Sequence, residues 1–207
     1  MLGLILILAA AGARAQTPGP IISEYVDGTG NDNALEIFNA TGGPIALGDY
    51  FIRIRFQDQP GVMLTAQLTA NTMLPSGETW VLVDDNAGPT LLGLADQTAT
   101  LVEFDGDDAI TLATWNGSTY DTIDSIGQWD VDPGDFWGCT GGDTQAVTMR
   151  RKFDVCVGDP IETDPFTPCP EWDFYPQDTF DGLGFHTCDS AVPVETVDWG
   201  TIKAVYR

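Results

Sequence analysis

Short segments in which apolar and polar residues alternate are the feature that most restricts the fold of this chain. The clearest runs from residue 50 to 56, where apolar side chains at the even positions alternate with Arg53 and Arg55. Because successive side chains of a strand point to opposite faces, this spacing predicts a strand with one buried face. Similar patterns predict strands at residues 21–26, 34–39, 62–68, 79–84, 100–104, 109–115, 119–126 and 146–152.

Turn residues separate these segments. Asp, Asn, Gly and Pro fill the intervals at residues 27–33, 41–44 and 105–108, and Asn116-Gly117 indicates a tight hairpin between Trp115 and Tyr120. With 23 glycines and 13 prolines, the composition argues against a helical bundle. About seven to nine short strands at this spacing predict an all-β, immunoglobulin-like antiparallel β-sandwich. The alternation fades near residue 153, so we expect residues 158–190 to be loop-like and held by cysteines.

The N-terminus predicts export. Residues 2–11 are apolar except for Gly3, a run of about ten residues that is too short for a membrane span of about 20. Ala13 and Ala15 supply the small residues that a signal peptidase requires, so we expect cleavage after Ala15. The alternative, an N-terminal core strand, is disfavoured by the break at residues 17–20. We expect residues 1–15 to be a signal peptide, and the mature chain to be secreted, periplasmic or at the cell surface without a membrane span.

The four cysteines agree with export. Cys139, Cys156, Cys169 and Cys188 form no C-x-x-C pair, and His186 is the single histidine, so a structural zinc site is poorly supported. Two disulfides are therefore expected, with three connectivities open. Each would contribute about 2–4 kcal/mol to stability.

Residues 191–207 follow the expected domain of residues 16–190 as a linker and a short amphipathic tail. Trp199, Ile202 and Val205 recur at helical spacing, which predicts a short C-terminal helix docked on the sandwich. A sorting or anchoring tail is the alternative. A helix this short is marginal unless it is docked.

Charge restricts the partners. The formal net charge of −23 opposes attraction to nucleic-acid phosphates, so no nucleic acid is expected. Arg150-Arg151-Lys152 forms a basic cluster in which alternation sends Arg151 to the side opposite its two neighbours. We expect these residues to form salt bridges with the protein's own acids.

No catalytic set is evident. A nucleophile–base pair would need His186, the cysteines are expected to be oxidised, and no serine lies in a G-x-S-x-G turn. Asp105, Asp107 and Asp108 are the candidate metal ligands, since Ca²⁺ binds carboxylate oxygens in such loops. The other explanation, which we favour, is that the acidic turns are Asx turns and strand caps. We therefore expect no cofactor, with bound Ca²⁺ as an alternative.

Taken in order, several segments resemble the lamin tail domain as it occurs in exported bacterial proteins. The resemblance covers residues 21 to 188. It rests on IISEYVDG at 21–28, NDNALEIFN at 31–39, LGDY at 47–50, FDGDDAI at 104–110, IDSIGQ at 123–128, DPG at 132–134, TMRRK at 148–152, EW at 171–172 and DTFDGLGFH at 178–186.

The resemblance implies an immunoglobulin-like sandwich and, by analogy, the disulfide pairs Cys156–Cys188 and Cys139–Cys169. In bacteria the domain often accompanies exported nucleases, phosphoesterases or adhesive modules. Here we expect it to stand alone, without an attached catalytic domain. We therefore expect an exported, non-catalytic binding, adhesion or assembly module whose partner is a protein or a surface polymer. The alternative is a small metal-dependent hydrolase, of a phosphoesterase or nuclease-associated kind, that uses Asp105, Asp107 and Asp108.

Overall fold

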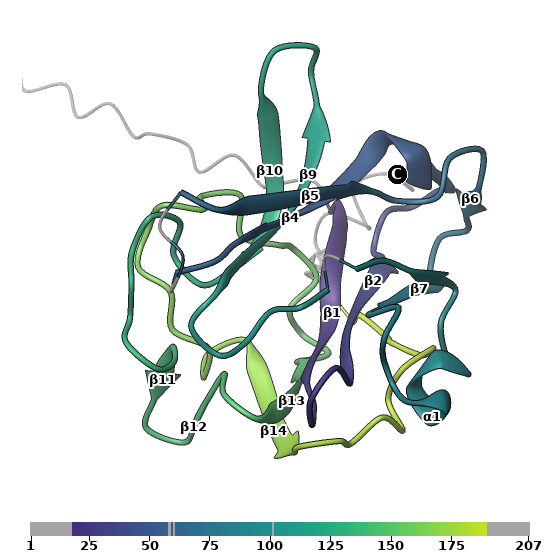
Figure 1. Cartoon of the computed structure of the whole chain (residues 1–207). Helices are drawn as coiled ribbons and strands as arrows, with labels where there is room; N and C mark the ends of the chain where they lie inside the picture. Colours follow the sequence, from purple (N-terminus) through teal and green to yellow (C-terminus); the bar gives the residue numbers. More distant parts are fainter. Residues whose placement is uncertain (1–17, 58, 60, 101, 190–207) are drawn as a thin grey trace, which may run out of the picture.

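Two β-sheets face each other in this protein (Figure 1). The computed structural model describes residues 18–57, 59, 61–100 and 102–189. The larger sheet has six strands in the order β14-β13-β1-β2-β7-β8, antiparallel except for β7 and β8. Its strands are β1 (Pro20–Asp27), β2 (Asn33–Asn39), β7 (Thr79–Val83), β8 (Gln97–Thr98), β13 (Val147–Arg151) and β14 (Trp172–Pro176).

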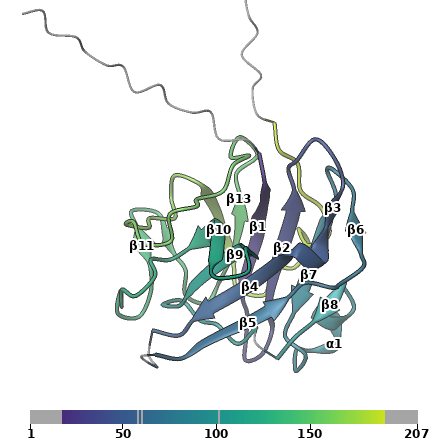
Figure 2. The same ribbon diagram turned by 90° about the horizontal axis from the view of Figure 1, so that it is seen from above.

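The smaller sheet has the order β10-β9-β4-β5 and is antiparallel throughout. Figure 2 shows its strands crossing obliquely over β1 and β2, and Figure 1 shows the β9–β10 hairpin extending beyond the sheets. Its strands are β4 (Tyr50–Arg55), β5 (Met63–Gln67), β9 (Ala109–Trp115) and β10 (Tyr120–Ile126). The remaining elements are β3 (Ile45–Ala46) with β6 (Met73–Leu74), β11 (Gly138–Cys139) with β12 (Gly142–Asp143), the 3₁₀ turn η1 (Leu47–Asp49) and the one-turn α1 (Pro89–Leu92).

The core lies between the two sheets and is built from alternate positions of the strands. Ile52 and Ile54 of β4 are fully buried together with Leu35 and Ile37 of β2, while Arg53 points to the opposite face. Each strand contributes apolar side chains at every second position, so each sheet has one apolar face. The apolar faces of the two sheets pack against each other and exclude water from the space between them. The predicted immunoglobulin-like β-sandwich is therefore confirmed.

Two expectations about individual segments are wrong. The strand expected at residues 100–104 is not formed: Thr100 lies in a turn and residues 102–105 join no sheet, although Val102 and Phe104 are buried in the core. Their apolar side chains indicate burial rather than strand pairing, since an irregular segment can also fill the core. The expected loop of residues 158–190 contains β14, which pairs with β13 and places Trp172 in the core.

A second apolar layer covers the outer face of the six-stranded sheet. Val26, Ala34 and Val81 are buried there. Phe180 and Leu183 pack on them from residues 178–188, which we call the strap. Helix α1 contributes Leu91 to the same layer.

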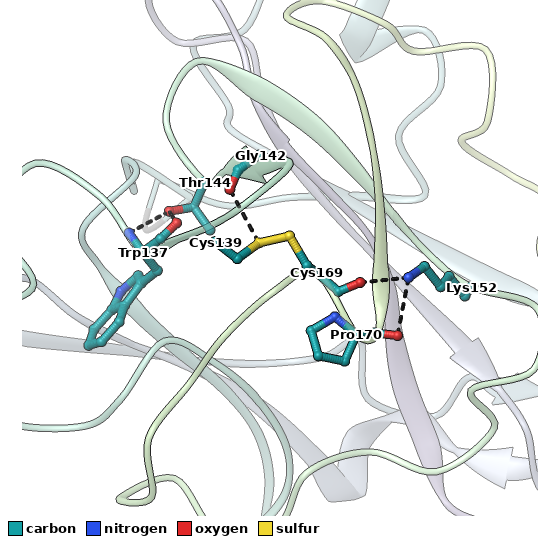
Figure 3. Close-up of a disulfide and its surroundings, with 7 residues drawn as sticks. All are labelled: Trp137, Cys139, Gly142, Thr144, Lys152, Cys169 and Pro170. Atoms are coloured by element: carbon teal, nitrogen blue, oxygen red, sulfur yellow. Dashed lines mark hydrogen bonds between the residues drawn. A yellow bond between two sulfur atoms is a disulfide. The ribbon is translucent and has the colours of Figure 1, made fainter.

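Two disulfides hold the C-terminal region. Cys139 joins Cys169 and Cys156 joins Cys188, which is the pairing that the resemblance implies. Figure 3 shows the first, where Lys152 Nζ donates to the carbonyl oxygen of Cys169 at 2.6 Å. The bond to Cys188 ties the end of the strap to residue 156, which follows β13.

The expected signal peptide of residues 1–15 and the tail of residues 191–207, with its C-terminal helix, lie outside the described residues. Within the described part of the chain, no helix combines the length and apolarity needed to cross a membrane.

Candidate functional site

The structure brings Asp105, Asp107 and Asp108 together. Their carboxylate oxygens lie within 4.8 Å of one another. Asp108, which is 4 % exposed, accepts hydrogen bonds from the backbone N–H of Gln57 at 3.0 Å and of Asp105 at 3.1 Å. Asp105 in turn accepts a bond from the N–H of Asp107 at 3.4 Å. The carboxylates therefore cap the turn before β9, and Asp105 is the one exposed enough to reach a cation in solution.

An acidic pocket lies beside this turn. It has a volume of about 380 Å³, and Asp27, Asp84, Glu103 and Asp105 line it together with Asn33. Burial raises the pKa of Asp27 to about 6, although the hydrogen bond donated by the Ala146 N–H acts to lower it. Asn33 orders the rim, since its side chain accepts from the Gly28 N–H and donates to the Phe104 carbonyl. These contacts organise the β1–β2 turn.

A charged cluster lies beneath the strap, with Glu24 and Glu36 buried and Arg150 partly exposed. Arg150 pairs with Glu24 at 3.2 Å and with Asp181 of the strap at 2.5 Å. Glu36 accepts hydrogen bonds from the Ser23 hydroxyl and the Gly184 N–H, each at 2.6 Å. Burial raises the pKa of Glu24 to about 7, although the Arg150 charge acts to lower it. Burial also raises the pKa of Glu36.

The cluster predicts a pH-dependent stability. A carboxyl whose pKa is raised by folding stabilises the native state fully below its unfolded pKa, and this contribution is lost as pH rises through the folded value. For Glu24 that window runs from 4.5 to about 7. Glu24→Gln is therefore expected to gain stability relative to the native protein across this window, by about 3 kcal/mol in total at 1.36 kcal/mol per pKa unit. Urea unfolding at several pH values measures the difference.

The native protein must be compared with the Glu24→Gln variant, because His186 changes the stability of the native protein with pH in the opposite direction. Burial, with the Arg151 charge, lowers its pKa to about 4, so its contribution grows between that value and 6.5. The difference between Glu24→Gln and native protein cancels this term. Glu78→Gln, at an exposed carboxyl, is the matched control and should show no such trend. A Glu24→Gln difference that stays constant over the window would contradict the assignment.

The basic cluster is used inside the fold. The side chain of Arg151 is fully buried and pairs with Asp124 at 2.5 Å and with Glu171. Its Nε donates to the Ile22 carbonyl at 3.1 Å, and its guanidinium lies 4.2 Å from the ring centroid of Trp172. The arginines therefore pair with the protein's own acids, as the sequence suggests.

The outer face of the four-stranded sheet is different in character. Phe51 and Arg53 of β4, Trp115 of β9 and Tyr120 of β10 share this face, since Trp115 pairs with Tyr120 and Phe51 and Arg53 alternate with buried isoleucines. With Trp129 from the following loop, we call these residues the aromatic face.

Aromatic contacts connect these side chains in a row. The Tyr120 ring lies 4.7 Å from Trp115 and 5.3 Å from Phe51, between ring centroids. Arg53 lies between two rings, 5.0 Å from Tyr120 and 4.4 Å from Trp129. Cation–π contacts of this geometry stabilise a guanidinium that has little exposure to water. The row is therefore a preorganised surface rather than a set of separate side chains.

Exposure is unequal along the row. Arg53 is 8 % exposed and pairs with Glu162 at 3.0 Å, whereas Trp115 is 47 % exposed. Met63 of the neighbouring β5 is 42 % exposed. Arg53 therefore supports the surface from below, and Trp115 is the side chain best placed to contact another molecule.

Sequence reasoning missed the aromatic face. The alternation placed Arg53 on the polar side of its strand, but Trp115 and Tyr120 were recognised only as the flanks of a hairpin. Trp129 and Glu162 come from loops, so no local spacing connects them with β4. The available signal was Phe51, an aromatic residue that alternates with the buried positions and therefore points outward.

Comparison with known proteins supplies a family. The model of the lamin tail domain matches residues 13–129, which is more than half of the chain. The match includes all strands of the four-stranded sheet and ends before β13 and β14, which complete the larger sheet. No curated protein matches the chain.

Proposed function

The chain belongs to the lamin tail domain family, and from this premise we propose that it is an exported, non-catalytic module, of the type found in exported bacterial proteins, that binds a protein partner through its aromatic face. The expected signal peptide and the two disulfides support an address outside the cytoplasm, since disulfides persist in oxidising compartments. Adhesion or assembly at the cell surface is the role that such a module would have.

The composition of the aromatic face is the observation that carries this proposal. Trp, Tyr, Phe, Met and Arg are enriched at the centres of protein interfaces, and acidic residues are depleted there. Trp115, Tyr120, Phe51 and Arg53 are of these types in a chain of net charge −23. A surface of this kind fits a protein partner better than a bare polyanion, which the protein's overall charge would repel.

The candidate catalytic groups are engaged in structural contacts, which supports a non-catalytic role. His186 packs edge-on against Phe38, with 4.9 Å between ring centroids. The cysteines are bonded in pairs, and Asp108 caps backbone amides. The alternative, a metal-dependent hydrolase that uses Asp105, Asp107 and Asp108, is not the function we propose, because Asp108 is occupied by these backbone hydrogen bonds.

Trp115→Ala tests the binding role. The residue lies next to the tip of the β9–β10 hairpin, so its truncation should leave the melting temperature nearly unchanged. If it is a central contact worth about 2 kcal/mol or more, the affinity should fall about 30-fold. Binding of the mature protein to an envelope preparation from the source cells, titrated with competing unlabelled protein, provides the measurement.

Phe153→Ala is the matched control, because Phe153 is 65 % exposed and lies away from the aromatic face along the chain. It should leave binding unchanged. Equal, saturable binding by native protein, Trp115→Ala and Tyr120→Ala would exclude the aromatic face as the site.

A further inference from the structure

Strand β5 is an edge that lacks the usual protection against pairing. Sheets protect their edges with charges, prolines, bulges or very short strands. In the described residues, β10 carries Asp121 and a register irregularity, β14 carries Asp173 and Pro176, and β8 has two residues. Strand β5 has none of these features, and its pairing with β4 is regular.

The pairing with β4 shows which backbone groups of β5 face outward. The Leu68 N–H donates to the carbonyl oxygen of Tyr50, and the Phe56 N–H donates to the carbonyl oxygen of Val62. Even positions of this segment are therefore the ones hydrogen-bonded to β4, since antiparallel pairs alternate. The N–H and C=O groups of Met63 and Thr65 consequently point away from the sheet.

The sandwich is also open on the core side of this edge. Leu64 pairs with Ile54 and shares its inward face, but Leu64 is 38 % exposed whereas Ile54 is fully buried. At the other end of the strand the Gln97 side chain donates to the Gln67 carbonyl at 3.2 Å. The accessible stretch is therefore the first half of β5. There the N–H and C=O groups of Met63 and Thr65 have no hydrogen-bond partner among the described residues, and the apolar side chain of Leu64 is partly exposed.

We propose that residues 199–207 of the same chain add to β5 as a further strand, in place of the short C-terminal helix that the spacing of Trp199, Ile202 and Val205 predicts. As a strand, this segment would place Ile202, Ala204 and Tyr206 on one side. Lys203 and Arg207 would share the other side with Trp199, Thr201 and Val205. As a strand, one side would cover Leu64 and the core edge, and the other would carry the cations into solvent. The segment has no acidic residue, so it is attracted to a body that accounts for most of the 31 acids.

Tethering favours the chain's own segment over that of a neighbour. Ten residues, 189–198, separate the strap from residue 199 and can span up to about 35 Å when extended. A short tether of this kind gives a local concentration in the millimolar range. This pairing is independent of the aromatic face, so either proposal can fail without the other.

Amide hydrogen exchange tests the proposal. The mature chain is compared with a form that ends at residue 190, and the exchange of Met63 and Thr65 is measured. We expect at least tenfold slower exchange in the longer form. A synthetic peptide of residues 199–207, added to the shorter form, should restore the protection. Equal exchange in the two forms would overturn the proposal.

Two variants make the test specific. Thr65→Pro removes an outward N–H, which an edge strand tolerates, and should abolish the protection of Met63, while Thr65→Ala should retain it. If Thr65→Pro fails to fold, Ile202→Asp with Tyr206→Asp removes the same pairing from outside the described domain. Protection that grows with protein concentration would instead mean that a second copy covers β5, and would overturn pairing within the chain.

Discussion

Arg151→Ala is expected to lower the free energy of unfolding by about 3–5 kcal/mol, the range found when one partner of a buried ion pair is removed. The Arg151 and Asp124 side chains are both fully buried and 2.5 Å apart. Without the guanidinium, the Asp124 carboxylate stays in the interior without a counter-charge. Urea unfolding monitored by tryptophan fluorescence gives the difference in free energy.

Lys152→Ala is the matched control, since Lys152 is the next residue and donates to the carbonyls of Cys169 and Pro170. It should cost about 1–2 kcal/mol, the net contribution of these two hydrogen bonds, of which the one to Pro170 is exposed to solvent. A loss of similar size in the two variants would contradict the importance of the buried pair.

The double variant Asp124→Leu with Arg151→Met separates two effects. Replacing a buried ion pair by apolar residues is often harmless in itself. Asp124, however, also accepts the N–H groups of Ile22 at 2.7 Å and of Asp159 at 2.9 Å. These amides would lose their acceptor, so the double variant is expected to stay destabilised by more than about 2 kcal/mol. Recovery to native stability would show that only the charge pair matters.

The strand pattern could be predicted because it is local. Residues 50–55 alternate as a half-buried strand requires, and residues 109–115 form a short run of mostly apolar and β-branched residues; both segments form strands. Phe104 shows the limit of the pattern, since it fills the core from a segment without strand pairing. Strand β14 was missed because Trp172 is surrounded by turn residues, and its pairing with β13 depends on tertiary packing.

The surface sites could be predicted less well, because they combine residues far apart in the chain. The approach of Asp105 to Asp108 follows from their spacing, and it was expected. The pairing of Arg151 with Asp124 joins strands of the two different sheets, and only the packing of those sheets defines it. Arg53 obtains its partners from Trp129 and Glu162 in the same way.

Removing the disulfide between Cys156 and Cys188 by serine substitution is expected to destabilise the protein by about 5–6 kcal/mol. The closed loop accounts for about 3–4 kcal/mol in the chain-entropy model. The rest comes from the strap, because Cys188 is its last residue and Phe180 and Leu183 leave the outer apolar layer when the strap detaches. Each partly buried apolar side chain contributes about 1 kcal/mol.

The other disulfide provides the comparison. Cys139 and Cys169 are 30 residues apart, and Cys156 and Cys188 are 32 apart, so the entropy terms are nearly equal. The Cys139→Ser, Cys169→Ser variant keeps the strap attached and should lose only about 3–4 kcal/mol. Detachment would also expose Glu24, so faster amide exchange in β1 is expected for the Cys156→Ser, Cys188→Ser variant alone. If the two variants lose equal stability and β1 exchanges alike in both, the strap adds nothing beyond its covalent bond.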